Sequence, residues 1–180
     1  MKKLLYGFAV MLIAAAPALA AIEKGNGELG AGVGSTQMDS ETDLDSATTL
    51  AVRGGYFFSK AWELEGQMAS ATADVSGTSE DATFRNYMVN GVYNFQTPKG
   101  IVPYVLAGVG IADTEFASQS DSSTAFQVGG GSRFYFGKEK RAAIRVDLSM
   151  IQQSVSNGVS DTTINNTNIS AGFTWRLGGK

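Results

Sequence analysis

The first candidates for chemistry are acidic side chains. Four of them stand at alternate positions of one segment: Asp39, Glu41, Asp43 and Asp45. Carboxylates are the ligands that Ca²⁺ and Mg²⁺ prefer, and an EF-hand loop begins in a similar way, but it needs Gly at its sixth position and Glu at its twelfth. Leucine occupies both places here (Leu44 and Leu50). We therefore expect a solvated, self-repelling loop, with loose binding of divalent cations as the alternative.

The residues that most enzymes use for acid–base and nucleophilic chemistry are missing. The 180-residue chain contains no His and no Cys, which excludes His general bases, Cys nucleophiles and thiolate zinc sites. A Ser–Lys pair needs a Lys within reach of the Ser, but the lysines beyond residue 20 stand at expected turns or termini. We therefore expect no enzymatic activity, no cofactor and no resident metal. The net charge of −3 argues against nucleic-acid binding.

Eight charged residues fall inside segments that otherwise have the pattern of β-strands. They are Arg53, Glu63, Glu65, Arg85, Arg133, Arg145, Asp147 and Arg176. An isolated buried charge is very costly, so we expect these residues to pair inside a narrow lumen. The pairing is either an electrostatic plug that holds a barrel closed or a gated path for ions or water.

The segments that must position these charges alternate with a period of two, which is typical of strands. Eight strands are predicted, at 27–34, 50–56, 62–68, 86–95, 103–112, 124–136, 143–150 and 166–177, and no helix is expected. Short connections near 59–60, 96–100 and 137–140 alternate with long ones at 35–47, 71–83, 113–123 and 152–162. An antiparallel meander of this kind predicts an all-β, eight-stranded up-and-down transmembrane β-barrel.

The aromatic residues favour a membrane barrel over a soluble one, which would turn its apolar face inward. They gather near the short connections and the C-terminus, as in an interfacial girdle. The predicted girdle consists of Tyr56, Phe58, Trp62, Tyr93, Phe95, Phe134, Phe136, Phe173 and Trp175. Phe57, Tyr104 and Tyr135 crowd the same end and are counted with it.

Acidic and basic residues are also distributed unequally between the long and the short connections. The long connections contain no Lys or Arg, whereas the short ones contain Lys60, Lys99, Lys138 and Lys140. Most of the acidic residues lie in the long connections: Asp39, Glu41, Asp43, Asp45, Asp74, Glu80, Asp81, Asp113, Glu115, Asp121 and Asp161. We expect these acidic connections to form the extracellular loops.

Residues 1–20 have the pattern of a signal peptide. Lys2 and Lys3 precede an uncharged apolar stretch at 4–16, and small residues stand at Ala18 and Ala20. The stretch is too short to span a membrane comfortably. We predict cleavage after Ala20, export, and one outer-membrane barrel domain over 21–180.

Three segments carry a resemblance to a known family: 90–95 (NGVYNF), 102–110 (VPYVLAGVG) and 171–177 (AGFTWRL). The chain resembles the small eight-stranded outer-membrane barrels of the OmpA, OmpX and opacity-protein type. It departs from them at its end, because family members commonly finish on an aromatic residue whereas this chain continues through Gly178, Gly179 and Lys180.

The resemblance implies a monomer in the outer membrane of a Gram-negative bacterium. Its expected partners are outer-membrane lipid, lipopolysaccharide and the barrel-assembly machinery, with divalent cations or host and surface ligands at the loops. The expected role is envelope structure or surface interaction, and a small porin-like ion channel is the alternative. Enzymes among such barrels depend on a His that this chain lacks.

Overall fold

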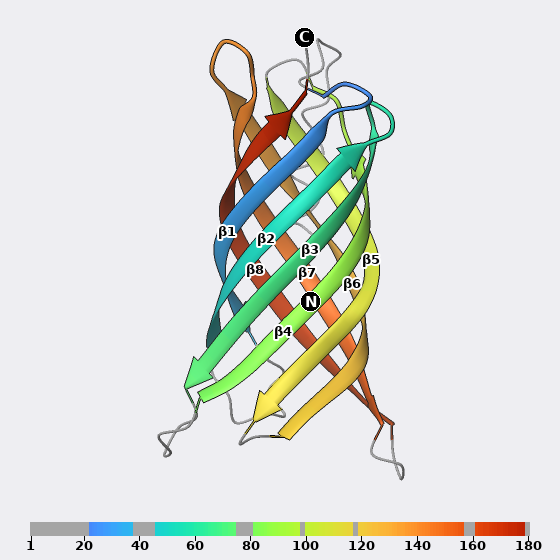
Figure 1. Ribbon diagram of the computed structural model, residues 1–180, viewed down its shortest axis with the longest axis vertical. Helices are drawn as coiled ribbons and strands as arrows, with labels where there is room; N and C mark the ends of the chain where they lie inside the picture. The colour runs from blue at the N-terminus through green and yellow to red at the C-terminus, as the bar shows by residue number, and fades with distance from the viewer. Residues whose placement is uncertain are drawn as a thin grey trace, which may run out of the picture.

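In the computed structural model, eight antiparallel strands close into a barrel in which β8 pairs with β1 (Figure 1). The predicted all-β up-and-down barrel is thereby confirmed. The strands are β1 (Gly27–Gln37), β2 (Ser46–Phe57), β3 (Trp62–Asp74), β4 (Asp81–Asn94), β5 (Ile101–Phe116), β6 (Gln119–Phe136), β7 (Ala142–Ser156) and β8 (Asp161–Leu177). The structure describes residues 22–37, 46–74, 81–97, 100–116, 119–156 and 161–178. Within these ranges no helix has the length and apolarity that crossing a membrane requires.

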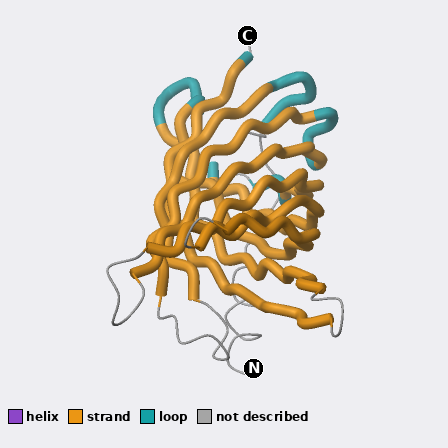
Figure 2. The backbone as a smooth tube through the Cα atoms, turned by 60° about the horizontal axis from the view of Figure 1, so that its bottom comes forward, coloured by secondary structure: helices purple, strands orange, loops and turns teal. Residues whose placement is uncertain are grey.

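The strands are strongly staggered. The line of paired residues that leaves β1 at Gly27 passes once around the barrel and returns to β1 at Gln37. Such a stagger requires strands that are tilted by roughly 35–45° from the barrel axis, and Figure 2 shows them winding obliquely around the wall. The interior of an eight-stranded barrel is only wide enough for side chains. Inward-facing residues on opposite strands must therefore contact one another.

The outer face carries an apolar band with a sharp edge toward the long connections. Each strand contributes one exposed apolar or aromatic side chain to this edge: Val33, Leu50, Met68, Tyr87, Ile111, Phe126, Met150 and Ile169. Two positions further toward the connections, the outward-facing residue is polar on every strand: Ser35, Thr48, Ser70, Arg85, Asp113, Thr124, Gln152 and Thr167. On β6 the band runs from Phe126 to Phe136, which at the tilt of the strand is about 25 Å along the axis of the barrel. This height matches the lipid-facing band of outer-membrane barrels.

The strands extend further toward the long connections than the sequence analysis predicted. β5 runs to Phe116 and β6 begins at Gln119, so the predicted connection 113–123 is largely strand. The predicted connections 35–47, 71–83 and 152–162 are shortened in the same way. Alternation is visible in a sequence only where one face is apolar, so these polar strand ends gave no signal. β6 has 18 residues and a membrane crossing needs about 9–11, so the wall continues beyond the apolar band.

Apolar clusters fill the lumen at several heights. At the short-turn end, Phe57, Val102 and Ala143 pack with Ile22 and Tyr135. Nearer the long connections there is a second cluster, formed by Met88, Ala112, Ala125 and Ile151. Between these two clusters, charged and polar side chains share the inward positions with Val92, Tyr104 and Leu106.

Candidate functional site: the charged lumen

Arg133 on β6 lies fully buried near the short-turn end of the lumen. Its Nε lies 2.8 Å from Oε1 of Glu28, and its Nη2 donates to Oε2 of Glu63 at 2.8 Å. Its Nη1 donates to Oδ1 of Asn94. The hydroxyl of Tyr135 donates to the second oxygen of Glu28 at 2.7 Å. One guanidinium therefore links β6 with β1, β3 and β4 across the lumen.

Arg145 on β7 is the second buried guanidinium. It bonds both oxygens of Glu65: Nη1 donates to Oε2, and Nη2 donates to Oε1 at 3.3 Å. Its Nε donates to Oδ1 of Asp147 at 2.9 Å and to the hydroxyl oxygen of Tyr104 at 2.7 Å. The Tyr104 hydroxyl in turn donates to Asp147. Every donor side of Arg145 thus meets an acceptor.

Shared carboxylates join these two centres. Oε2 of Glu65 lies 3.8 Å from Nη2 of Arg133, so Glu65 contacts both buried guanidinium groups. Oδ2 of Asp147 lies 3.6 Å from Nη2 of Arg53 on β2. The result is a continuous set of ion pairs, which we call the lumen network: Glu28, Arg53, Glu63, Glu65, Arg133, Arg145 and Asp147.

The ring of Tyr104 contacts both buried guanidinium groups. The Cζ atoms of Arg133 and Arg145 each lie 4.6 Å from its ring centroid. A positive charge is attracted to the face of an aromatic ring, so the tyrosine stabilises both charges. Burial of an ion costs several kcal/mol unless a partner compensates for it, and here each buried Arg has carboxylate partners and an aromatic face.

Two inward-facing glycines leave the space that these side chains occupy. A Cβ atom on Gly131 would overlap the carbonyl oxygen of Val146 and lie 2.9 Å from Cζ of Tyr104, and a Cβ on Gly55 would lie 3.0 Å from the carboxyl carbon of Glu63. Both distances are shorter than ordinary van der Waals contact. The missing side chains therefore determine where Tyr104 and Glu63 lie.

Six of the eight charged residues predicted for the lumen lie in the network: Arg53, Glu63, Glu65, Arg133, Arg145 and Asp147. Arg85 does not lie there. Phe84 packs inward against Ala47 and Ala71, and successive strand residues point to opposite faces, so Arg85 points outward. It lies opposite Asp113 in the β4–β5 register, at the polar edge of the outer band. The prediction that Arg85 faces the lumen is wrong.

Arg176 lies at the rim of the barrel and is not part of the lumen network. Its Nη2 donates to the backbone carbonyl of Glu139, in the turn between β6 and β7, at 3.2 Å. Its position alternates correctly for the inward face, but it is too near the end of β8 to meet Arg145 and its partners.

Glu28, Tyr104 and Tyr135 lie in the lumen but are not among the residues predicted for it. The signal for Glu28 was present, because it alternates with Leu29 on β1. Tyr104 was counted with the girdle because both faces of β5 are apolar or small, so its phase was not readable. Tyr135 was counted there with its neighbours, although alternation on β6 turns it inward. Phe57 is also buried in the lumen, so these three aromatics are not part of the outer girdle.

The nine residues predicted for the girdle all lie around the short-turn end, exposed or half-buried. The ring of Tyr93 packs edge-on against Trp62 and Phe95, with centroid distances of 5.0 Å in both cases. The ring centroid of Phe173 lies 6.2 Å from that of Phe136 and 6.4 Å from that of Trp175. These contacts form parts of an aromatic belt, and its role as a membrane anchor stays a prediction.

The acidic segment 39–45 lies outside the described residues, so the structure does not test its cation binding. Among the residues that the structure describes, no group of three or more acidic side chains is arranged to hold a metal ion. Asp113, in one predicted acidic connection, accepts a hydrogen bond from Ser122 Oγ at 2.6 Å.

A closed eight-stranded barrel with an apolar outer band and a charged lumen defines the class of small outer-membrane barrels. The family model of the outer membrane protein beta-barrel domain matches residues 6–176. The chain therefore belongs to this family, and its location is the bacterial outer membrane. In such barrels the short turns face the periplasm and the longer connections face outward. No curated protein matches the chain.

Solved structures of outer-membrane barrels have the same fold. Neisserial surface protein A is 14% identical with a TM-score of 0.68, over 84% of this chain and 99% of that one. OprG of Pseudomonas aeruginosa is 15% identical with a TM-score of 0.59, over 90% and 100%. Ail of Yersinia pestis, in complex with the heparin analogue sucrose octasulfate, is 19% identical with a TM-score of 0.56, over 86% and 99%. At these identities the likeness shows the fold alone.

Proposed function

We propose that this protein is a non-enzymatic outer-membrane barrel whose lumen is closed by the lumen network and which serves envelope structure or surface interaction. The observation that carries the proposal is the complete burial of Arg133 and Arg145 between carboxylates from the opposite wall. The absence of His and Cys from the sequence supports a role without catalysis.

The geometry of the ion pairs supports a closed lumen. Arg133 on β6 reaches Glu63 on β3, and Arg145 on β7 reaches Glu65 on the same strand. These contacts cross the interior, so a permeating ion would have to separate them. Separation leaves a buried charge without its partner, at a cost of roughly 3–5 kcal/mol. We infer that the resting barrel conducts few ions or none.

The end that carries the long connections is the proposed seat of surface interaction. The wall there extends beyond the apolar band, and the predicted loops contain many Asp and Glu residues and no Lys or Arg. A surface of this charge attracts divalent cations and repels polyanions. The structure of Ail holds a polyanionic heparin analogue, but we expect this chain to prefer cationic or cation-bridged ligands, lipopolysaccharide included.

The surroundings that we propose for the barrel follow from its surface. Outer-membrane lipid and lipopolysaccharide cover the apolar band, and the barrel-assembly machinery inserts the chain after export through the signal peptide at 1–20. All eight strands find their partners within one chain, which supports a monomer.

Conductance across a planar bilayer tests this proposal. Wild-type protein, shown to be folded by a heat-dependent gel shift, should be silent. Arg145→Ala should produce openings, because it removes the side chain that fills the lumen beside Glu65 and Asp147. Arg141→Ala is the matched control, because Arg141 lies at the exposed rim, where it pairs with Glu139. Steady, charge-selective currents from wild type that Arg145→Ala alters would establish the narrow ion channel instead.

A further inference from the structure

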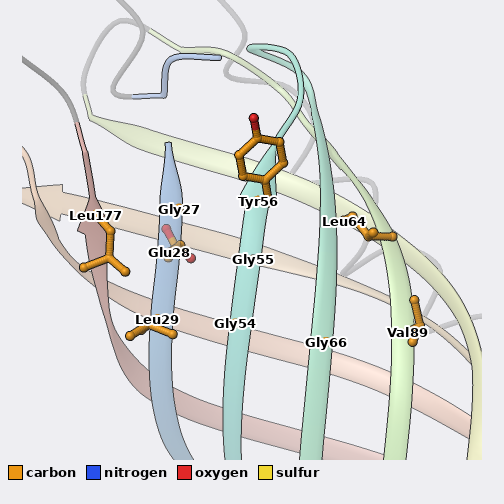
Figure 3. A pocket seen from close by; sticks show the side chains of 10 residues that line it. All are labelled: Gly27, Glu28, Leu29, Gly54, Gly55, Tyr56, Leu64, Gly66, Val89 and Leu177. Carbon is orange, nitrogen blue, oxygen red and sulfur yellow. The ribbon is translucent and has the colours of Figure 1, made fainter. Parts of the chain in front are cut away.

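An apolar groove crosses the lipid-facing surface over β1 to β4. One part has a volume of about 410 Å³ and is lined by Leu29, Gly54, Tyr56, Leu64, Gly66 and Val89 (Figure 3). It continues into a second part of about 520 Å³ that reaches Val52 and Met68. Both parts share Leu29, Gly54, Gly66 and Val89, so they form one depression, which we call the outer groove.

The floor of the outer groove is backbone. Gly54 and Gly66 pair across β2 and β3 and both face outward. A Cβ atom on Gly54 would meet only Cδ2 of Leu29, at 3.5 Å, and one on Gly66 would meet only the carbonyl oxygen of Gly54, at 3.9 Å. The walls are side chains such as Leu29 and Val89, each more than half exposed. The depression is therefore open space that a slender apolar ligand can fill.

The outer groove extends from the aromatic belt across the apolar band. It begins at Tyr56 and Leu177, near the belt, passes Val52, and reaches Met68 and Tyr87 at the far edge of the band. From Tyr56 to Val52 the strand advances about 13 Å along its own axis, or about 10 Å along the axis of the barrel. An extended acyl chain whose headgroup lies at the short-turn end fits this span.

The headgroup end of the outer groove is basic. Lys24 precedes Gly25, whose amide donates to the carbonyl of Phe57 at 2.7 Å, so Lys24 lies beside the end of β2. Lys60 lies in the turn that follows, where Oγ of Ser59 accepts from the amide of Trp62 at 2.9 Å. Both lysines are exposed, as is the acidic side chain of Glu23 next to Lys24 in the sequence. The Tyr56 hydroxyl points toward the same end (Figure 3).

We propose that the outer groove binds an anionic phospholipid of the periplasmic leaflet. One acyl chain lies over Gly54 and Gly66, and the phosphate lies near Lys24, Lys60 and the hydroxyl of Tyr56. The charge of the lysines favours phosphatidylglycerol over phosphatidylcholine. A second copy of the barrel fits less well, because a convex wall does not enter a narrow groove and a stable interface needs about 1,000 Å².

Native mass spectrometry of the full barrel, ejected from nanodiscs of equal phosphatidylglycerol and phosphatidylcholine, tests the proposal. Wild type should retain phosphatidylglycerol in preference to phosphatidylcholine. Gly66→Leu fills the groove and should lose most of the retained lipid. Gly91→Leu is the control: it also adds a leucine to an open outward position, where a Cβ meets only the carbonyl oxygen of Ala107, at 3.8 Å, but Gly91 does not line the groove. The gel shift should show all of these barrels folded.

A second variant distinguishes the contribution of the lipid headgroup from that of the acyl chain. Lys24→Gln with Lys60→Gln should keep the bound lipid but reduce the preference for phosphatidylglycerol by roughly fivefold per lysine. Equal lipid retention by Gly66→Leu and Gly91→Leu would overturn the proposal, as would equal retention of the two lipids by wild type. A dimer mass that Gly66→Leu abolishes would instead assign the groove to a second copy. None of these outcomes depends on whether the lumen conducts.

Discussion

The two glutamates of β3 that face the lumen should respond very differently to the same substitution. Glu65 accepts from Arg145 through both oxygens and also contacts Arg133. Glu63 accepts through Oε2 from Arg133 and Asn94, and its Oε1 has no hydrogen-bond partner among the described residues. Glu65 is therefore the central carboxylate of the network, although both side chains are equally buried.

Glutamine keeps the shape of glutamate but replaces one acceptor oxygen with a donor. In Glu65→Gln this NH₂ group must face a guanidinium nitrogen, and Arg145 keeps only Asp147 as a charged partner. We expect a loss of about 3–5 kcal/mol in the free energy of unfolding, the cost of breaking a buried pair. In Glu63→Gln the carbonyl replaces Oε2 and the NH₂ takes the unpartnered position, while Arg133 keeps Glu28. We expect a loss below about 1.5 kcal/mol, within the net value of one hydrogen bond.

Equilibrium unfolding in urea, in phosphatidylcholine vesicles, measures both changes. Trp62 and Trp175 both lie on the outer face near the aromatic belt and report on insertion by fluorescence, and the gel shift reports on closure of the barrel. Glu139→Gln is the control, because Glu139 is 74% exposed at the rim and surface ion pairs contribute little. If Glu65→Gln unfolds at the same urea concentration as Glu139→Gln, the network does not stabilise the barrel and the reasoning is refuted.

Three further predictions follow from the same contacts. The double variant Glu65→Leu/Arg145→Met should recover most of the stability that either single substitution removes, because neither charge is left without its partner. A double-mutant cycle in urea measures the coupling energy, and additive losses would contradict the prediction. Gly131→Ala should destabilise the barrel by about 1–3 kcal/mol, because the new Cβ overlaps both the carbonyl oxygen of Val146 and the ring of Tyr104. Gly66→Ala on the open outer face should have little effect, and equal urea midpoints would show that the wall and Tyr104 both have room to move. Trp62→Ala should cost roughly 0.5–1.5 kcal/mol in lost packing against Tyr93, and an unchanged midpoint would show that this ring pair does not support the belt.

For the charged residues of the lumen, the sequence predicts which way they face but not which partners they meet. Alternation indicated that Glu63, Arg133 and Arg145 face inward, and the cost of burying charge indicated that they pair. Their partners were not readable, because they depend on the stagger of strands distant in the sequence. Glu28 and Arg133 are separated by most of the chain and meet at 2.8 Å only because the wall closes between β1 and β8.

Two errors have separate physical causes. Arg85 shares its phase with Tyr87 and Val89, so its outward position could be read from the sequence. What the sequence did not give was the height of the membrane, which places Arg85 at the polar edge of the band, where an outward charge is tolerated. Tyr104 had no readable phase, because both faces of β5 are apolar or small.

The sequence by itself determined the strand meander, the inward and outward faces of most strands, and the location in the outer membrane. These properties depend on local patterns, since a period of two and a lipid-facing apolar stripe are expressed within each strand. Only the tertiary structure decided which charges meet, that Tyr104 contacts two guanidinium groups, and that Gly54 and Gly66 leave a groove. Those outcomes depend on register, stagger and closure, which set the distances between side chains on different strands.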